Sequence, residues 1–342
     1  MPDASSQFSQ HDFIKEFEGA LSILDSAENV GCSLGKAGTQ RLFFVGCGAP
    51  LFMMKAVAYW AEKFTIHTEV RVYSAAEFVH QDPAALDEGT AVFLGSHSGT
   101  TKEVVQAAEF LLIKPCKTIA FTQHADSALG KTVGEIFSYG SSRQGYFSSF
   151  ILTLAFMSAY LKERELGWNY HKKIMDSLAN LPEALAEAKE RSQKTGRNLA
   201  EEICNADILY IIGSGPMYTT SYVFASCFLM EMQWMHAFPL SAAEFFHGPF
   251  EVFDMNTPAI LLLGEDPSRP EAERVLKFCR KNTIKPMVFD SRDYSMPGIH
   301  PEIRPLVAPF ILDAALTNLV ETLAVIRQHP LSTHRYMGKV EY

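Results

Sequence analysis

Short apolar runs that end in glycine recur along the chain. Residues 41–48 read RLFFVGCG, and residues 208–215 read ILYIIGSG. A compact apolar run followed by glycines is typical of a buried strand that leads into a helix. The glycines that end the two runs, Gly46 and Gly213, are 167 residues apart, which is close to half of the 342-residue chain. This separation suggests that each half of the chain holds one copy of a common unit.

A second pair of segments supports this duplication. Residues 74–80 (SAAEFVH) and 241–247 (SAAEFFH) share six of seven residues and are again 167 apart. Two matches at one separation are poorly explained by chance. The sequence therefore predicts two copies of one unit built from strands and helices.

Strand-like runs alternate with helical ones in both halves. These runs are β-branched and aromatic without strict apolar and polar alternation, which favours an α/β fold with parallel sheets covered on both faces. We expect strands at residues 42–45, 70–73, 91–94, 118–121 and 136–139 in the first half, and at 209–212, 259–263 and 287–289 in the second. Residues 7–29 predict one amphipathic helix, and residues 163–202 predict helices that join the halves, with a break at 181–182.

Composition narrows the class of protein. The chain is 47% hydrophobic and 20% charged, as expected of a packed globular protein, and its net charge of −9 disfavours nucleic acid as a partner. The apolar runs are shorter than the roughly 18 residues that a membrane span needs, and the polar N-terminus lacks the features of a secretory signal. Six cysteines without close Cys or His spacing argue against disulfides and a metal site. We therefore expect a cytoplasmic protein without a membrane span.

A candidate phosphate loop follows the third predicted strand. Residues 94–105 read LGSHSGTTKEVV, so four hydroxyls, those of Ser96, Ser98, Thr100 and Thr101, crowd around Gly99 where a helix begins. Hydroxyls and backbone N–H groups that converge on a helix N-terminus are suited to bind an anion. The alternative is that one hydroxyl merely caps the helix. In the second copy, Glu265 and Asp266 replace the serines and would repel phosphate, so we expect anion binding in the first copy alone.

Nucleotide cofactors are not favoured. No Gly-Lys-Ser/Thr follows the glycine of this loop, as a Walker loop would require. The glycine pairs at residues 46–48 and 213–215 lack the third glycine of a dinucleotide fingerprint, and no acidic residue ends the following strand. We therefore expect no organic cofactor.

Two side chains in the second half are candidates for acid and base. Glu231 lies within the apolar run 228–235 (FLMEMQWM), and the residue 167 positions earlier is Phe64, so the fold of the unit does not require an acid there. His247 is followed by Gly248 and Pro249, which force a turn and can present the imidazole. A carboxylate among apolar neighbours and an imidazole are suited to proton transfer beside a carbonyl group. Alternatively, Glu231 lies on the exposed face of an amphipathic helix and His247 is structural.

These motifs resemble the SIS (sugar isomerase) superfamily over nearly the whole chain. The resemblance is strongest to double-SIS proteins, namely the fructosamine 6-phosphate deglycases and the isomerase half of glucosamine-6-phosphate synthase. It rests on five segments: the Cys-Gly pair at 47–48, SHSGTT at 96–101, MEMQWMH at 230–236, EFFHGP at 244–249 and RYMGKVEY at 335–342. The motifs at 230–236 and 244–249 and the Val-Glu-Tyr ending look more like those of the deglycases, and no glutaminase half precedes them.

The resemblance implies a fold of two tandem SIS domains, each a parallel five-stranded sheet flanked by helices in a flavodoxin-like, three-layer αβα arrangement. It implies the following parts: an N-terminal helical segment at 1–34, a first SIS domain with the phosphate loop at 35–165, a helical linker at 166–195, a second SIS domain with Glu231 and His247 at 196–330, and a C-terminal tail at 331–342 that closes the active site.

The resemblance also implies roles for individual residues. Ser96, Ser98 and Thr101 match phosphate ligands, with His97 and Gly99 in the same loop and Gly48 a further candidate for substrate binding. Pro50 replaces a serine that contributes to phosphate binding in the synthases. Glu231 matches the general base, and His247 matches a histidine that in relatives can reach the site of a neighbouring subunit, which implies at least a homodimer. Lys339 resembles a ring-opening lysine of the synthases.

The implied activity is cleavage of a fructose-amino-acid 6-phosphate, a phosphorylated Amadori product, to glucose 6-phosphate and a free amino acid. No metal or organic cofactor is implied. Two alternatives remain open at this stage. One is an aldose–ketose or amino-sugar phosphate isomerase that uses the same two residues, and the other is a regulator that binds a sugar phosphate without catalysis.

Overall fold

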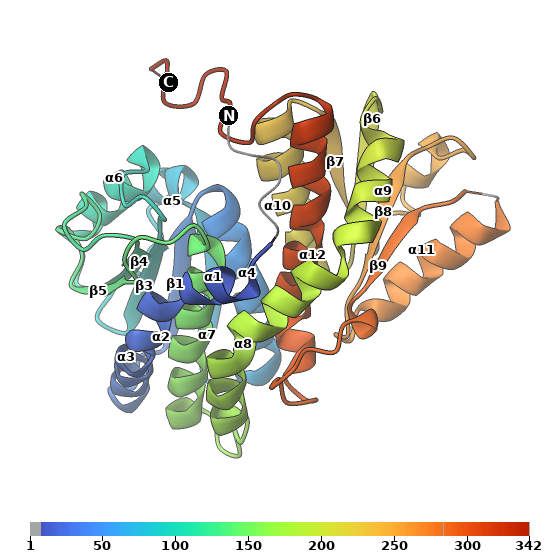
Figure 1. Cartoon of the computed structure of the whole chain (residues 1–342). Helices are drawn as coiled ribbons and strands as arrows, with labels where there is room; N and C mark the ends of the chain where they lie inside the picture. Colours follow the sequence, from blue (N-terminus) through green and yellow to red (C-terminus); the bar gives the residue numbers. More distant parts are fainter. Residues whose placement is uncertain (1–7, 283, 342) are drawn as a thin grey trace. The chain divides into compact units, whose positions relative to one another are not determined.

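The computed structural model describes residues 8–282 and 284–341, and the chain divides into two compact units (Figure 1). The N-terminal unit contains residues 11–182 together with 298–303. The C-terminal unit contains the described residues of 1–10, 183–297 and 304–342. Each unit is built around its own parallel sheet.

The N-terminal unit has the five parallel strands that the sequence predicted. Their order in the sheet is β2 (Glu69–Ser74), β1 (Arg41–Gly46), β3 (Thr90–Gly95), β4 (Lys117–Thr122) and β5 (Glu135–Ser138). This order is the flavodoxin-like one, in which the chain leaves β1 for neighbours on either side. The α/β prediction is confirmed for this unit.

Helices cover both faces of this sheet. On one face, Phe43 and Val45 of β1 pack with Phe78 of α5 (Ala75–Gln81) and with Val104 of α6 (Lys102–Leu111). Successive strand residues point to opposite faces, so Phe44 turns the other way and contacts Phe93. The ring centroid of Phe93 in turn lies 4.9 Å from that of Phe156 of α7 (Gly145–Arg164). Helix α7 also packs against α3 (Leu24–Lys36) and α4 (Gly48–Phe64). Two helical layers therefore enclose the sheet.

The single helix predicted at residues 7–29 is replaced by three, and residue 7 lies outside the described residues. The chain forms α1 (Gln10–Lys15), α2 (Glu18–Ser22) and α3. The bend after α1 carries Phe17 into the core, where it is fully buried and lies 5.5 Å from Phe13 and 6.4 Å from Phe147. Aromatic packing therefore outweighs the helical periodicity of the segment.

The sheet of the C-terminal unit has four strands in the described residues, so the prediction of a fifth strand in this sheet is wrong. Their order is β7 (His236–Ser241), β6 (Ile208–Gly213), β8 (Ala259–Leu263) and β9 (Met287–Asp290), all parallel. After β9 the chain forms the 3₁₀ turn η3 (Ser291–Asp293), and the following ten residues include Pro297, Gly298 and Pro301. Proline cannot donate to a ladder and glycine weakens a strand, so this segment does not extend the sheet.

Helices also pack on the sheet of the C-terminal unit. On one face, α11 (Arg269–Lys281) packs on Ile212 and Leu261, and a loop after β7 adds Phe245 to the same cluster. The remaining helices are α9 (Gln193–Ile203), α10 (Met217–Val223), the π-helix η1 (Phe224–Met232), the 3₁₀ turn η2 (Pro249–Val252) and α12 (Arg304–Ile326). The chain is thus α-helical from Met217 only as far as Val223 and continues from Phe224 to Met232 as a π-helix.

The break predicted at residues 181–182 is also wrong. Helix α8 runs from His171 to Arg191 with Pro182 inside it. Leu178, Leu181 and Leu185 are fully buried on both sides of the proline. Burial of this apolar stripe offsets the backbone hydrogen bond that proline removes.

Helix α12 is a core element that the sequence analysis did not single out. By length and composition alone, it is the one helix in the described residues that could cross a membrane. However, 67% of its most apolar window is buried inside the structure, and α12 packs against α9 and α10. Burial of this kind is typical of the central helix of a globular domain.

Candidate functional site

The candidate phosphate loop lies at the switch point of the first sheet. Gly46 at the end of β1 pairs with Gly95 at the end of β3, and these adjacent strands lead into α4 and α6. Ligands of open α/β sheets bind at the carboxyl ends of the strands where the strand order reverses. The sequence-predicted residues 96–101 and Gly48 thus occupy the edge of this sheet where a ligand is expected.

Hydroxyls in the loop are bonded to one another and to the loop backbone. Ser96 is buried, and its Oγ lies 2.8 Å from Oγ1 of Thr101 and accepts from the N–H of Gly99 at 3.1 Å. The Oγ of Ser98 accepts from the N–H and the hydroxyl of Thr100. Thr101 is the N-cap residue of α6, yet its side chain makes no capping bond. Helix capping therefore does not explain why hydroxyls gather here.

His97 is oriented by a tyrosine that the sequence analysis missed. Its Nδ1 lies 2.6 Å from the hydroxyl of Tyr139, and the two rings stack at 5.9 Å. Burial raises the pKa of Tyr139 to about 12, so its hydroxyl is protonated and is able to donate to Nδ1. Burial, followed by the nearby His124, lowers the pKa of His97. A neutral ring that accepts at Nδ1 carries its proton on Nε2, so His97 can donate one hydrogen bond to an anion.

Gly99 sets the shape of the loop. Its φ of +67° lies in the left-handed region, and a Cβ there would lie 2.5 Å from the Cβ of Ser127 and 2.6 Å from Oγ1 of Thr122. Its carbonyl also accepts from the N–H of Leu129 at 2.9 Å. Because backbone conformation and space both require glycine, the loop cannot accept a side chain at this position without moving.

The sequence assigns phosphate binding to this loop, so we predict that Gly99→Ala weakens binding of a sugar phosphate about tenfold, since overpacking of this kind costs about 1–3 kcal/mol. Calorimetric titration would measure the loss. The matched control is Gly38→Ala, because Gly38 has a similar φ of +75° but nothing within 4 Å of an added Cβ, and it lies before β1 at the opposite edge of the sheet. Equal loss of affinity in both variants would contradict a specific role for the Ser96 loop.

Gly48 and Pro50 begin helix α4 beside this loop. Gly48 is the first residue of the helix and has a φ of +56°. Pro50 lies in the first turn, where the missing N–H costs no helical hydrogen bond. Pro50 supplies neither a hydroxyl nor an N–H to an anion, so it cannot make the contact of the serine that it replaces.

In the C-terminal unit, the loop equivalent to the Ser96 loop is occupied by internal bonds. Glu265 accepts from Arg304 at 2.8 and 3.0 Å, and Asp266 accepts from the N–H of Ser268 at 2.9 Å. Arg269, the first residue of α11, is buried and makes an ion pair with Asp290. The carboxylates that replace the serines therefore stabilise the fold where the N-terminal unit has hydroxyls.

Glu231 lies near the end of the π-helix η1, half-buried beside the C-terminal tail. π-Helix is rare and is found frequently at functional sites. Oε1 of Glu231 lies 3.4 Å from Nε2 of His334. Burial raises the pKa of the Glu231 carboxyl, and His334 offsets part of this increase. A carboxyl group with a raised pKa in a half-buried position is a candidate for proton transfer.

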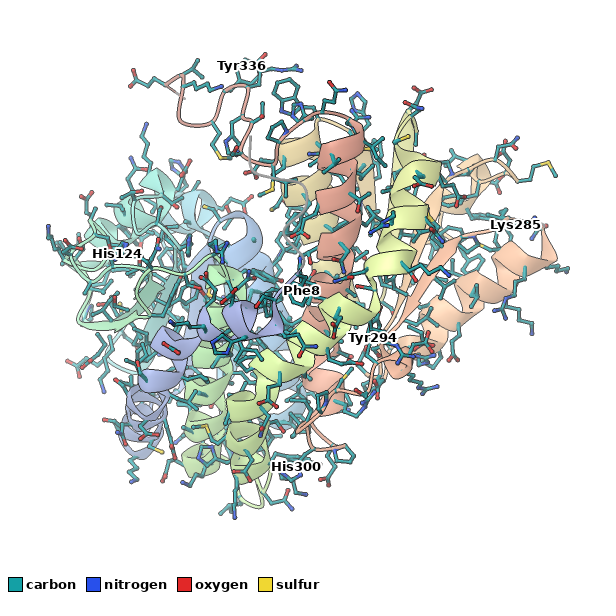
Figure 2. The ribbon with its side chains drawn as sticks, viewed as in Figure 1. Phe8, His124, Lys285, Tyr294, His300 and Tyr336 are labelled. Atoms are coloured by element: carbon teal, nitrogen blue, oxygen red, sulfur yellow. The ribbon has the colours of Figure 1, made fainter. Side chains whose placement is uncertain are left out.

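A pocket of about 480 Å³ surrounds this carboxyl group. The tail contributes part of its wall, and Figure 2 labels one of these tail residues, Tyr336. The lining residues are Met230, Glu231, Trp234, Met235, His236, His334, Arg335, Tyr336 and Met337. A pocket of this size accommodates a small organic ligand. The sequence analysis expected a tail at 331–342 that closes the site, but it assigned a role only to Lys339, because no periodic pattern marks the individual residues of a tail that packs on a helix end.

His247 lies far from Glu231 within the C-terminal unit. Glu231 precedes the amino end of β7, whereas His247 follows its carboxyl end, and six strand residues span about 20 Å. The loop of His247 packs on the α11 face through Phe245 and Phe278, whose rings are 5.8 Å apart. His247 itself is exposed. The structure therefore does not bring the two predicted catalytic residues together in one C-terminal unit.

Lys339 lies in the tail but does not line the pocket. Its Nζ donates to the backbone carbonyl of His334, and its own N–H donates to the carbonyl of Tyr336 at 2.8 Å. These bonds close a turn in the tail. The described contacts of Lys339 thus support the position of His334 beside Glu231.

Comparison with known proteins gives consistent results. Residues 37–162 match the family model for the SIS domain. The chain is 34% identical to the fructosamine deglycase FrlB of Bacillus subtilis, covering 89% of this chain and 93% of that protein. It is 30% identical to the fructoselysine 6-phosphate deglycase of Escherichia coli, covering 90% and 88%.

A solved structure from Bacillus subtilis, assigned as a phosphosugar isomerase, superposes with a TM-score of 0.85 at 30% identity and covers 97% of this chain and all of that one. The similarity to these proteins extends over both units rather than one. The chain belongs to the SIS-domain family, together with the fructosamine and fructoselysine 6-phosphate deglycases.

Proposed function

We propose that this protein is a fructosamine 6-phosphate deglycase, which cleaves a fructose-amino-acid 6-phosphate to glucose 6-phosphate and the free amino acid. The observation that carries the proposal is the half-buried Glu231 carboxyl, whose raised pKa and surrounding pocket suit a general base at a sugar carbon. The similarity to two deglycases over about nine tenths of the chain supports the choice of substrate class.

The Ser96 loop binds the 6-phosphate in this proposal. Ser96, Ser98 and Thr101 supply hydroxyls, Gly99 supplies the turn, and Nε2–H of His97 supplies a further donor. The dipole of α6 favours a negative group at its N-terminus. Binding energy from the phosphate then positions C1 and C2 of the sugar for reaction.

Glu231 moves protons between C1 and C2. The substrate carries its amine on C1 and a carbonyl at C2, so Glu231 removes a proton from C1 while an acid protonates the carbonyl oxygen, giving an enaminol. Return of a proton to C2 with loss of the N–H proton gives the imine of glucose 6-phosphate. Water adds to C1 of the imine, and the bond between C1 and the nitrogen then breaks, which releases glucose 6-phosphate and the free amino acid. One water is consumed, and the proton transfers need only a carboxylate and an imidazole.

His247 acts as the acid and comes from a second copy of the chain. The exposure of His247 and its location at the opposite end of β7 from Glu231 support this assignment. Isologous dimers place each copy of a residue against the partner's surface, so one dimer contains two equivalent sites. We propose a homodimer at least, located in the cytoplasm.

The experiment that tests the function uses conjugates with and without phosphate. The purified protein is incubated with fructosamine 6-phosphates of several amino acids, and glucose 6-phosphate is measured with a coupled dehydrogenase. We expect release from the phosphorylated conjugates and none from the same fructosamines without phosphate. Interconversion of free sugar phosphates without cleavage of any conjugate would instead assign an isomerase, and binding without turnover would assign a regulator.

A further inference from the structure

The pocket around Glu231 contains a cation whose charge has no described partner. Arg335 is the one Lys or Arg side chain among the lining residues. In the described part of the chain, no carboxylate lies within ion-pair distance of its guanidinium, whereas Glu231 is paired with His334. A guanidinium presents a planar fork of donors that fits a carboxylate.

Stacking holds Arg335 at the pocket wall. Its guanidinium carbon lies 4.2 Å from the ring centroid of Trp234, and that ring contacts His329 at 4.4 Å. Trp234 has a φ of +52°, and the adjacent Gln233 is fully buried and donates to the carbonyl of His329 at 2.9 Å. Stacking on an aromatic face fixes the plane of a guanidinium group, and the N–H groups at its edge remain able to donate hydrogen bonds.

We propose that Arg335 binds the α-carboxylate of the amino acid part of the substrate, so that the enzyme prefers conjugates of α-amino acids to conjugates of uncharged amines. This inference rests on the proposed function and deepens it. The α-carboxylate is separated from C1 of the sugar only by the nitrogen and the α-carbon. Since Glu231 acts at C1, a group in the same pocket reaches the carboxylate.

The other charges of the pocket agree with an anionic ligand. His236 and His334 are the remaining titratable side chains with a basic nitrogen, and Glu231 is the one carboxylate in the lining. The pairing of Glu231 with His334 leaves Arg335 for the ligand. A charge-assisted bond of this kind is worth about tenfold in affinity or more.

The test compares two substrates that differ by one charge, the 6-phosphorylated fructosamines of glycine and of glycinamide. We expect the wild-type kcat/KM for the glycine conjugate to exceed that for the glycinamide conjugate about tenfold. Arg335→Gln should bring this ratio close to one, and Arg335→Lys should restore part of the preference for the glycine conjugate. Damage to the fold would lower both rates and leave the ratio intact.

The matched control is Arg274→Gln in the same unit. Arg274 also stacks 4.2 Å from an aromatic centroid, that of Phe246, but it pairs with Glu271 and does not line the pocket. We expect its ratio to match the wild-type value. An unchanged ratio in Arg335→Gln would overturn the inference. If the protein turns over neither conjugate, the proposed function fails, and the ratio of calorimetric affinities for the two conjugates still decides the role of Arg335.

Discussion

Replacement of Glu231 by glutamine is expected to lower kcat on a phosphorylated conjugate about 10²–10⁴-fold, because an amide cannot accept the proton from C1. Glutamine keeps the size of the side chain, and the described ion pair it removes is the single one to His334, which is partly exposed. Phosphate binding depends on other residues. The KM should therefore change little while kcat falls, since the lost interaction acts only in the transition state.

The pH dependence of kcat/KM in the wild-type enzyme should also show whether Glu231 is the base. Glu231 must be deprotonated to act as a base, and its pKa is raised above that of a free glutamic acid side chain, chiefly by burial. As the pH falls through this raised pKa, kcat/KM should fall with it. The residual rate of Glu231→Gln should lack this acid limb.

Glu202→Gln provides the control for this experiment. Glu202 is an exposed carboxylate on α9 of the same unit, so its loss removes the same charge from the surface. Its kcat and pH profile should match those of the wild-type protein. A Glu231→Gln variant with nearly full kcat and an unchanged acid limb would exclude Glu231 as the base.

The recurrence of sequence features at a separation of 167 residues explains why so much of the fold could be predicted from the sequence. Strands β1 and β6 begin and end 167 residues apart, and so do β2 and β7, although β7 was not among the predicted strands. Pro239 interrupts the apolar residues of β7, so the strand lacks the continuous apolar run from which other strands were predicted. The proline is tolerated because β7 is at the edge of its sheet.

The repeated heptapeptide shows where sequence similarity fails to fix local structure. Residues 74–80 form most of helix α5, whereas residues 241–247 form turns. Phe78 and Phe245, which occupy the same position in the two segments, are both fully buried. The shared sequence therefore corresponds to a shared core residue and not to a shared helix. The difference follows from the next residues, because Pro249 cannot continue a helix and Gly248 adopts a φ of +129°.

The candidate site could be predicted only in part, because some of its residues are contiguous in sequence and others are not. The Ser96 loop is contiguous in sequence, so its hydroxyl cluster is visible without a structure. Tyr139, His334 and Arg335 act through contacts with residues that are distant along the chain: Tyr139 and His97 are 42 positions apart. Such pairings depend on tertiary packing, which local patterns do not encode.

The proposal that His247 acts across a dimer predicts that two inactive variants restore activity to each other. Glu231→Gln and His247→Ala should each be nearly inactive as homodimers. When the two are co-expressed with different tags and the heterodimer is purified, one of its two sites pairs an intact Glu231 with an intact His247. The heterodimer should then recover about half of the wild-type activity per dimer.

A second heterodimer decides between sharing and a site within one chain. A wild-type chain paired with a chain that carries both substitutions has no site with both residues intact if His247 acts across the dimer, so it should be nearly inactive. If both residues acted within one chain, this second heterodimer would keep about half of the activity and the first would have none. The separation of Glu231 and His247 by the length of β7 leads us to expect the first pattern. Because the two arrangements give opposite results in both heterodimers, subunits that merely fail to fold cannot imitate either one.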